Sequence, residues 1–499
     1  MKKKKKKDKR RFHGTFTLST GQGCFGELLI KGRRTRLSLS SSDELPMLRS
    51  AGTVLGQTLD GTYITCVDCV GSSQGGSMSG TYRYAHMFPH YVLMGENHIN
   101  PVAPIIRKIS FAVDDLSTIF YDFDAFGTMH DASGLIEKVL GQVEKGRVVE
   151  VGEWAHIGYF TGKLKVAEVE TVIGKVEVSH RPSFGMGGPE GVHIENAMYV
   201  IIEFIEPLIF ENAIDRVISV ARFLSVVAGR VQGIENIEIQ TDEDMRGERH
   251  KPTRVHWSLG PKSANRTSPS HKPSPGDVPF HPLERIEELG RVLANWIKDE
   301  PTRYIARNRY IACLKRSNKY GPDRIVAAAN MFDVMPLDAT PGKAALPADL
   351  LNAQRAIIEI LKAIDRSDEQ NAAMAAIKRL GYPVLRRKVL HRAAFITDQM
   401  GSSFPRLDEV LKLAIKCRNY FVHGNSSGFK FETVEPYVPF LTDSLEFTFA
   451  ASELIEAGWD GVEWNKQPHG LGHSFARFRA SYKEGLAHLE KAGVLGAAK

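Results

Sequence analysis

Residues 407–425 read LDEVLKLAIKCRNYFVHGN, and the C-terminal half of the chain is best understood from this stretch. Five positions recur at alternating spacings of four and three: Leu407, Leu411, Ala414, Arg418 and Phe421. That spacing is typical of one face of an α-helix packed on a core. Arg418 therefore stands in an apolar stripe, at a position where a purely structural helix would carry leucine.

Both ends of this helix carry signals. Ser402 or Ser403 can cap its start, and Asp408 with Glu409 suits the positive N-terminal end of the helix dipole. Gly424 offers a left-handed stop after the last turn. His423 is thus predicted at the C-terminus of the helix, where the dipole favours a protonated imidazole.

Arg418 and His423 are five positions apart, which separates them by about 140° around an ideal helix. They can converge if the last turn opens at Gly424, or if two copies of the helix meet in a dimer. Arginine, asparagine and histidine together suit a phosphate. Arginine grips two oxygens, Asn419 adds a neutral donor, and histidine moves a proton near pH 7.

The segment Arg418-Asn419-Tyr420-Phe421-Val422-His423-Gly424 resembles the R-x4-6-H motif of HEPN ribonucleases, with a polar residue after the arginine and a small residue after the histidine. The surrounding chain resembles the ApeA group of bacterial anti-phage proteins, which join a β-rich N-terminal domain to a C-terminal HEPN domain. The resemblance implies a homodimer whose two motifs face one cleft, and it implies RNA, with transfer RNA as a family-level expectation, as the substrate.

The bare pattern also occurs elsewhere, in Arg386 with His391 and in Arg249 with His256, without the flanking asparagine and glycine. The alternative without catalysis is that Arg418 is an interface ion-pair residue and His423 a helix-capping histidine.

The composition is that of an ordinary globular protein of 499 residues, with 42% hydrophobic and 25% charged side chains. The net charge is +7, but residues 2–11 hold nine positive side chains and one negative. The remainder is therefore close to −1, which argues against a general polyanion binder. The N-terminal run is predicted to be a solvated tail that can also strengthen binding to RNA. Five cysteines, no long apolar run and no secretory signal favour a reducing cytoplasm, with no membrane partner.

A local basic surface is predicted beside the motif. Between residues 378 and 423 there are ten lysines and arginines against three acids. We therefore expect RNA-binding residues here, next to the predicted catalytic residues Arg418, Asn419 and His423. The expected set is Arg386, Arg387, Lys388, Arg392 and Lys416.

The chain is predicted to be an α+β multidomain protein, with a β-rich, sandwich-like or barrel-like N-terminal domain followed by an all-α HEPN bundle. The expected divisions are a basic disordered tail at 1–11, a β-rich sensor domain at 12–258, a Pro/Ser linker at 259–282, the HEPN domain at 283–460 and a tail with a short helix at 461–499. Residues 71–80 are expected to be a flexible loop, and 213–227 a helix within the β-rich domain.

One pattern suggests zinc. Cys66 and Cys69 are followed by His86 and His90 at a spacing slightly long for a zinc finger. We favour an ordinary strand, in which the two cysteines point to opposite faces. No metal and no other cofactor is expected.

The resulting hypothesis is a metal-independent endoribonuclease that cuts RNA by 2′-OH attack during abortive infection. The alternative is a non-catalytic HEPN protein that binds nucleotide or RNA as a sensor or interaction module. A β-domain binder of carbohydrate or protein with a passive helical tail is a third class, which leaves Arg418 unexplained. A phage-derived trigger is expected to act on the β-rich half.

Overall fold

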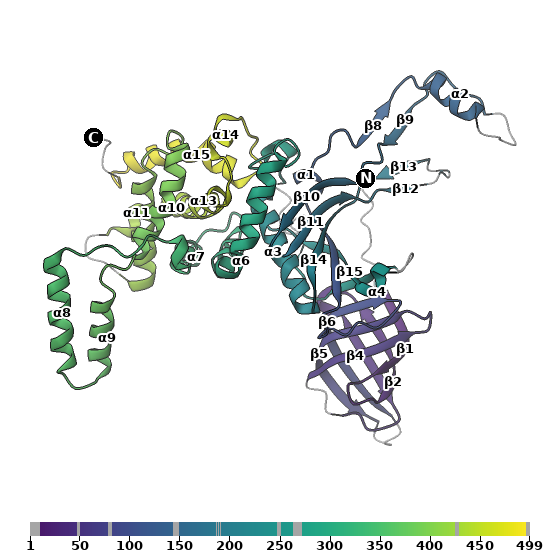
Figure 1. The fold of residues 1–499 in the computed structure, drawn as a ribbon, viewed down its shortest axis with the longest axis horizontal. Coiled ribbons are helices and arrows are strands. Elements are labelled where there is room, and N and C mark those ends of the chain that lie inside the picture. The colour runs from purple at the N-terminus through teal and green to yellow at the C-terminus, as the bar shows by residue number, and fades with distance from the viewer. Residues whose placement is uncertain are drawn as a thin grey trace. The chain divides into compact units, whose positions relative to one another are not determined.

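The structure is a computed structural model that describes residues 10–46, 50–77, 82–142, 149–185, 187, 189, 191–246, 251–262, 272–424 and 429–495. The chain divides into two compact units, Met1–Ile297 and Lys298–Lys499. The first is rich in strands and the second is helical (Figure 1). The predicted order, a β-rich half followed by an α-helical half, is confirmed.

The strands of the N-terminal unit that join its main sheet are all antiparallel to their neighbours. They are β1 (Arg10–Thr17), β2 (Gly23–Ile30), β3 (Arg36–Ser41), β4 (Ser50–Thr58), β5 (Tyr63–Gly76), β6 (Arg83–Gly95), β7 (Ile106–Val113), β10 (Lys165–Thr171), β11 (Gly174–His180), β14 (Met198–Leu208), β15 (Ile234–Thr241) and β16 (Thr253–Trp257). Two small sheets pair β8 (Phe126–Met129) with β9 (Ile157–Phe160), and β12 (Ser183–Gly185) with β13 (His193–Glu195).

Strands β1 to β6 close into a barrel, because β6 pairs with β3 on one side and with β5 on the other (Figure 1). Alternate side chains point inward, as the period of a β-strand requires. Phe16, Leu28, Leu37, Val54 and Ile64 are fully buried in this barrel core. The outward positions of β1, β2 and β3 are half-buried or exposed.

The sheet continues from β6 through β16, β15, β7, β14 and β11 to β10, outside the barrel. Helix α3 (Phe210–Ala228) packs against β7 and buries Val217 and Leu224. It ends at Gly229, whose φ of 66° favours glycine. The helix expected over 213–227 is therefore present, and the short helices α1 (Leu116–Ile119), α2 (Ser133–Gly141) and α4 (Asp242–Arg246) complete the unit.

Two local predictions in this unit need correction, and each falls partly outside the described residues. The expected loop at 71–80 is strand as far as Gly76, because β5 pairs with β6 up to Arg83. The expected tail at 1–11 overlaps β1, which begins at Arg10. Residues 1–9 and 78–81 lie outside the described residues.

Cys66 and Cys69 both lie in β5, as predicted, but not on opposite faces. Asp68 adopts a positive φ of 52°, and the register between β5 and β4 shifts at this point. Both thiols are consequently buried in the barrel core, where a hydrogen bond with Cys69 and burial raise the pKa of the Cys66 thiol. His90, the last residue of the possible zinc pattern, accepts a hydrogen bond from Trp257 Nε1 at 3.1 Å. Among the described residues no group of three or more His, Cys, Asp or Glu side chains could hold a metal ion.

The C-terminal half of the chain is helical, and its first helix, α6 (Ile286–Leu314), spans the division between the two units. The others are α7 (Pro322–Asp333), α8 (Ala348–Lys362), α9 (Asp368–Lys378), α10 (Leu385–Met400), α11 (Leu407–His423), α12 (Phe431–Val434), α13 (Val438–Ala457), α14 (Gly461–Lys466) and α15 (Ser474–Lys491). Helix α6 is a single long helix that continues through Pro301.

Helix α13 is the centre of the helical unit, because it packs against α7, α10, α11 and α15. Nearly all of its side chains are buried, including Leu441, Leu445, Phe449 and Leu454. Helix α15 comes from the segment expected as a tail, and its Tyr482 is fully buried. Residues 474–491 are therefore part of the packed bundle, and no helix in the described part of the chain is long and apolar enough to cross a membrane.

Candidate active site

Helix α11 carries the predicted motif and runs unbroken from Leu407 to His423. It begins after Arg406, which has a left-handed φ of 58° and no capping side chain, so the expected caps Ser402 and Ser403 are wrong. Ser403 instead bonds Asn465. The residues of the predicted stripe that precede Arg418 are fully buried, as the periodicity indicated: Leu407, Leu411 and Ala414.

Arg418 turns toward α7 and is held there by amide oxygens. Its Nη1 donates to Asn419 Oδ1 at 3.0 Å, and its Nη2 donates to Asn330 Oδ1 at 2.9 Å. Nη2 also lies 3.7 Å from Asp333 Oδ2, and only 14% of the side chain is exposed. The Nε atom is buried and has no hydrogen-bond partner among the described residues. The guanidinium is therefore fixed in orientation, and its buried Nε–H remains unused among the described residues.

A second cation reaches the same place. Lys388 of α10 donates from Nζ to the Asp333 backbone oxygen at 2.8 Å and lies 4.0 Å from its carboxylate. We name Asn330, Asp333, Lys388, Arg418 and Asn419 the Asp333 cluster. It contains two cations and one carboxylate, so its formal charge is positive, as a phosphate site requires.

His423 lies at the exposed end of α11, away from the Asp333 cluster. Its side chain has no hydrogen bond or ion pair within the described residues. The last turn is regular, because the Gly424 N–H donates to the Tyr420 oxygen at 3.0 Å. Gly424 takes a φ of 77° only after that turn. The helix does not open, so Arg418 and His423 leave it on different sides, about 140° apart.

Aromatic rings of the motif itself pack against helix α12. Tyr420 stacks on Phe431 of α12 with 4.7 Å between ring centroids, and Phe421 meets the same ring edge-on at 5.0 Å. These contacts join α12 to the last turn of α11. The sequence had not indicated them, because they link two segments through packing alone.

The predicted RNA-binding residues differ in their exposure and in their hydrogen bonds. Arg386 and Lys416 are exposed, as RNA contact requires. Arg387 donates to the Gly381 and Gly342 backbone oxygens at 3.2 and 3.3 Å, while Lys388 belongs to the Asp333 cluster.

Arg392 is a correction, because only 1% of its side chain is exposed. It donates to Glu453 at 3.0 Å, to Glu456 at 2.5 Å and to Ser452 at 2.9 Å. These acceptors belong to α13, some 60 residues further along the chain, so local charge could not reveal the pairing. Arg392 is a buried structural cation.

Two comparisons with known families match the chain. The family model ApeA N-terminal domain 1 matches residues 7–296, and the family model Apea-like HEPN matches residues 326–462. The chain belongs to the ApeA family. The HEPN match contains most of α7 and all of α10, α11 and α13, and therefore the whole Asp333 cluster together with His423. Neither the curated proteins nor the solved structures that were searched gave a match.

This ApeA architecture, with its C-terminal HEPN domain, places the chain among HEPN-type anti-phage defence proteins. The resemblance inferred from the motif at 418–424 is thus confirmed for the family. The domain limits remain predictions. The ApeA match ends at residue 296 and the compact N-terminal unit at Ile297, both beyond the predicted linker at 259–282, of which residues 263–271 lie outside the described residues.

Proposed function

We propose that this protein is a metal-independent endoribonuclease that cuts RNA in the cytoplasm of a phage-infected cell. The observation that supports this most is that one helix, α11, carries both Arg418 of the Asp333 cluster and the exposed His423. Helix α11 carries an arginine whose orientation is fixed by two amide oxygens, and an exposed histidine ends the same helix. Orientation of a guanidinium before substrate binds reduces the entropy lost when a phosphate is bound.

The chemistry uses the nucleophile that RNA carries. The 2′-oxygen attacks the adjacent phosphorus, its proton goes to a base, and the bond to the 5′-oxygen breaks as that oxygen gains a proton from an acid. His423 serves as base or acid. Arg418 stabilises the charge on the pentavalent phosphorus, and Asn419 holds Arg418 in place. The products are a 2′,3′-cyclic phosphate and a 5′-hydroxyl.

A dimer follows from the geometry of a single helix. The regular last turn leaves Arg418 and His423 on different sides of α11. One chain therefore does not direct both groups at one phosphate. Two copies of α11 facing each other would place the histidine of one copy near the arginine of the other, and would supply separate residues for the acid and base roles. Transfer RNA is the proposed substrate class, and a phage product is the proposed trigger.

Purified protein incubated with labelled RNA in EDTA tests this proposal. We expect cleavage, with fragments that end in a 2′,3′-cyclic phosphate. A substrate with a single 2′-deoxy residue at the cleaved position should stay intact there, because it lacks the nucleophile. Activity that disappears on chelation and returns with magnesium would contradict the mechanism.

A non-catalytic role is the second candidate, and one observation favours it. Arg418 is mostly buried and already bonded in this chain, which suits a structural or nucleotide-gripping residue as well as a catalytic one. In that case RNA would be bound but not cut, and the His423→Ala variant would bind RNA as the original protein does.

A further inference from the structure

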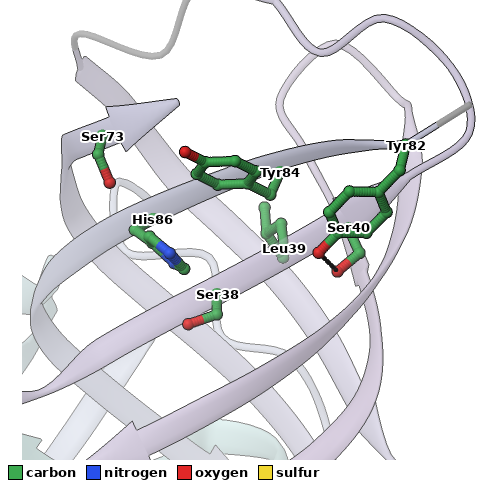
Figure 2. Close-up of a pocket in the computed structure, with 7 residues that line it drawn as sticks. All are labelled: Ser38, Leu39, Ser40, Ser73, Tyr82, Tyr84 and His86. Atoms are coloured by element: carbon green, nitrogen blue, oxygen red, sulfur yellow. Dashed lines mark hydrogen bonds between the residues drawn. The ribbon is translucent and has the colours of Figure 1, made fainter. Parts of the chain in front are cut away.

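The outer face of the barrel carries a hollow of about 390 Å³ that the proposed nuclease function does not use. It lies over strands β3, β5 and β6 (Figure 2). Three hydroxyl side chains and three rings line it: Ser38, Ser40, Ser73, Tyr82, Tyr84 and His86. A space of this size accommodates one small planar ligand or one unit of a polymer.

Strand alternation explains why these side chains meet. Inward residues of β3 and β6, such as Leu39 and Met87, fill the barrel core, so their neighbours in sequence face outward. The ladder sets Ser38 opposite His86 and Ser40 opposite Tyr84. On the other side of β6, β5 sets Ser73 opposite His86 and Gly75 opposite Tyr84.

Gly75 makes room for the ring of Tyr84. A Cβ atom at this glycine would lie 2.8 Å from the Tyr84 hydroxyl oxygen and 2.9 Å from its Cζ. The ring therefore lies across the backbone of Gly75. A side chain at residue 75 would displace it.

The three rings form a row along one strand. The centroids of Tyr82 and Tyr84 are 6.3 Å apart, and those of Tyr84 and His86 are 5.4 Å apart. Tyr82 is 46% exposed, and its hydroxyl lies 3.4 Å from Ser40 Oγ. Phe25, 54% exposed, stands opposite Ser40 on the next strand and extends the aromatic surface.

Two arginines lie near the row: Arg36, which acts on His86, and Arg83, which lies 3.7 Å from the carboxylate of Glu44. Burial lowers the pKa of His86, and the nearby Arg36 lowers it further, so the imidazole is neutral at pH 7. Its Nδ1 atom is buried without a hydrogen-bond partner among the described residues, a cost that a bound polar group can remove. The lining holds no carboxylate, and Glu27 on the adjacent strand is occupied by Arg11 at 2.6 and 2.7 Å.

We propose that this face of the barrel binds single-stranded nucleic acid, with one base stacked in the row formed by Tyr82, Tyr84 and His86. Neighbouring rings in a row stack bases of any sequence, and the exposed Arg36 can attract a phosphate. The hydroxyls of Ser38, Ser40 and Ser73 both donate and accept, so they can meet the edge of any base. This site is on the N-terminal unit, and the proposal does not depend on RNA cleavage by the HEPN domain.

Fluorescence anisotropy with the full-length His423→Ala protein tests the proposal, because this background should leave RNA intact. The probes are labelled oligouridylate and oligothymidylate, which distinguish an RNA ligand from a DNA ligand. We expect Tyr84→Ala to raise the dissociation constant by about 5- to 150-fold, as the loss of one base stack does. Gly75→Val should weaken binding similarly by displacing the Tyr84 ring.

Tyr159→Ala is the matched control. Tyr159 is also a partly exposed tyrosine whose ring lies against a glycine, Gly127, but on the small sheet of β8 and β9. Its replacement should leave affinity unchanged. The more exposed Tyr82→Ala keeps the test decisive if the Tyr84 variant fails to fold. Unchanged affinity in Tyr82→Ala, or equal weakening in Tyr159→Ala, would overturn the proposal. Loss of cleavage in the original protein would bear only on the nuclease proposal.

Discussion

At the residue scale, a substitution of His423 should affect RNA cleavage without affecting the stability of the fold. The side chain is exposed at a helix end and makes no bond to the described residues, so His423→Ala should change the free energy of unfolding by no more than about 0.5 kcal/mol. RNA cleavage should fall by at least about 100-fold, the lower end of what acid–base catalysis contributes. Val422→Ala, a change at the neighbouring exposed position, is the control in the same cleavage and thermal-melting assays. Full activity of His423→Ala would reject the proposed role.

Arg418 is tested by a change that keeps its charge. Lysine carries one ammonium group, which cannot reach both Asn419 Oδ1 and Asn330 Oδ1 in the planar arrangement of the guanidinium. We expect Arg418→Lys to reduce the cleavage rate at saturating RNA by about tenfold or more. The same variant should retain its helical circular dichroism signal. A rate within twofold of the original protein would show that charge alone suffices.

The sequence identified Arg418, Asn419 and His423 because they are close together in one helix. It did not identify Asn330 and Asp333, because their pairing with Arg418 depends on how α7 packs against α11, 85 to 88 residues apart. Arg392 was misassigned for the same reason. A basic side chain near a motif looks exposed until the acids that bury it, Glu453 and Glu456, are placed beside it.

At the element scale, α13 depends on a buried ion network. Glu453 is fully buried and bonded to Arg303, Arg307 and Arg392 at 2.8 to 3.0 Å. Burial alone would raise the pKa of Glu453, but these guanidinium groups outweigh it and hold the pKa below its usual value. A depressed folded-state pKa adds stability above the unfolded-state value of about 4.3, and this stability is lost as pH falls through the folded-state pKa.

Glu453→Gln should therefore destabilise the helical unit strongly, by about 3–5 kcal/mol, because it removes one of the carboxylates that pair with the buried Arg303, Arg307 and Arg392. The difference from the original protein should be present at pH 7. It should shrink as the pH falls below about 4.3, where Glu453 binds a proton in the unfolded chain, and should disappear only below the depressed folded-state pKa. Urea denaturation followed by circular dichroism at both pH values measures this. The control is Glu359→Gln, which removes an exposed pair with Lys362 and should cost under about 1 kcal/mol. Equal effects of the two changes would contradict the role given to burial.

The bulge in β5 is a second element-scale feature. Asp68 has a φ of 52°, which asparagine tolerates and a β-branched residue does not. Asp68→Val should lower the stability of the N-terminal unit by about 1–3 kcal/mol, whereas Asp68→Asn should cost less. Strand periodicity predicted that Cys66 and Cys69 would face opposite ways. It failed because a single extra residue reverses the alternation, and sequence alone does not mark where a bulge occurs.

At the scale of the whole molecule, the change from period-two to helical patterning was enough to predict a β-rich half and an α-rich half. The closure of β1 to β6 into a barrel was not predictable in detail, because β4 and β6 lack simple alternation and closure depends on long-range pairing. Helix α15 was expected as part of a tail, yet its Phe475, Tyr482 and Leu489 pack as core residues. The sequence of a short amphipathic segment near a terminus does not show whether the segment packs against the rest of the domain.

The dimer is the prediction that belongs to this scale. If one phosphate needs Arg418 of one copy and His423 of another, the cleavage rate per chain should fall on dilution as dimers dissociate. Sedimentation velocity and RNA cleavage, measured at matched protein concentrations, should then give the same midpoint concentration for dimer dissociation and for loss of activity.

Mixing the Arg418→Ala and His423→Ala proteins provides a second test of the dimer. A site built from both copies regains one intact Arg418–His423 combination in the mixed dimer, so some activity should return when two inactive proteins are combined. Full activity per chain in a species that sediments as a monomer would mean that α11 rearranges within one chain, and the regular last turn ending at Gly424 would then be the element that has to open.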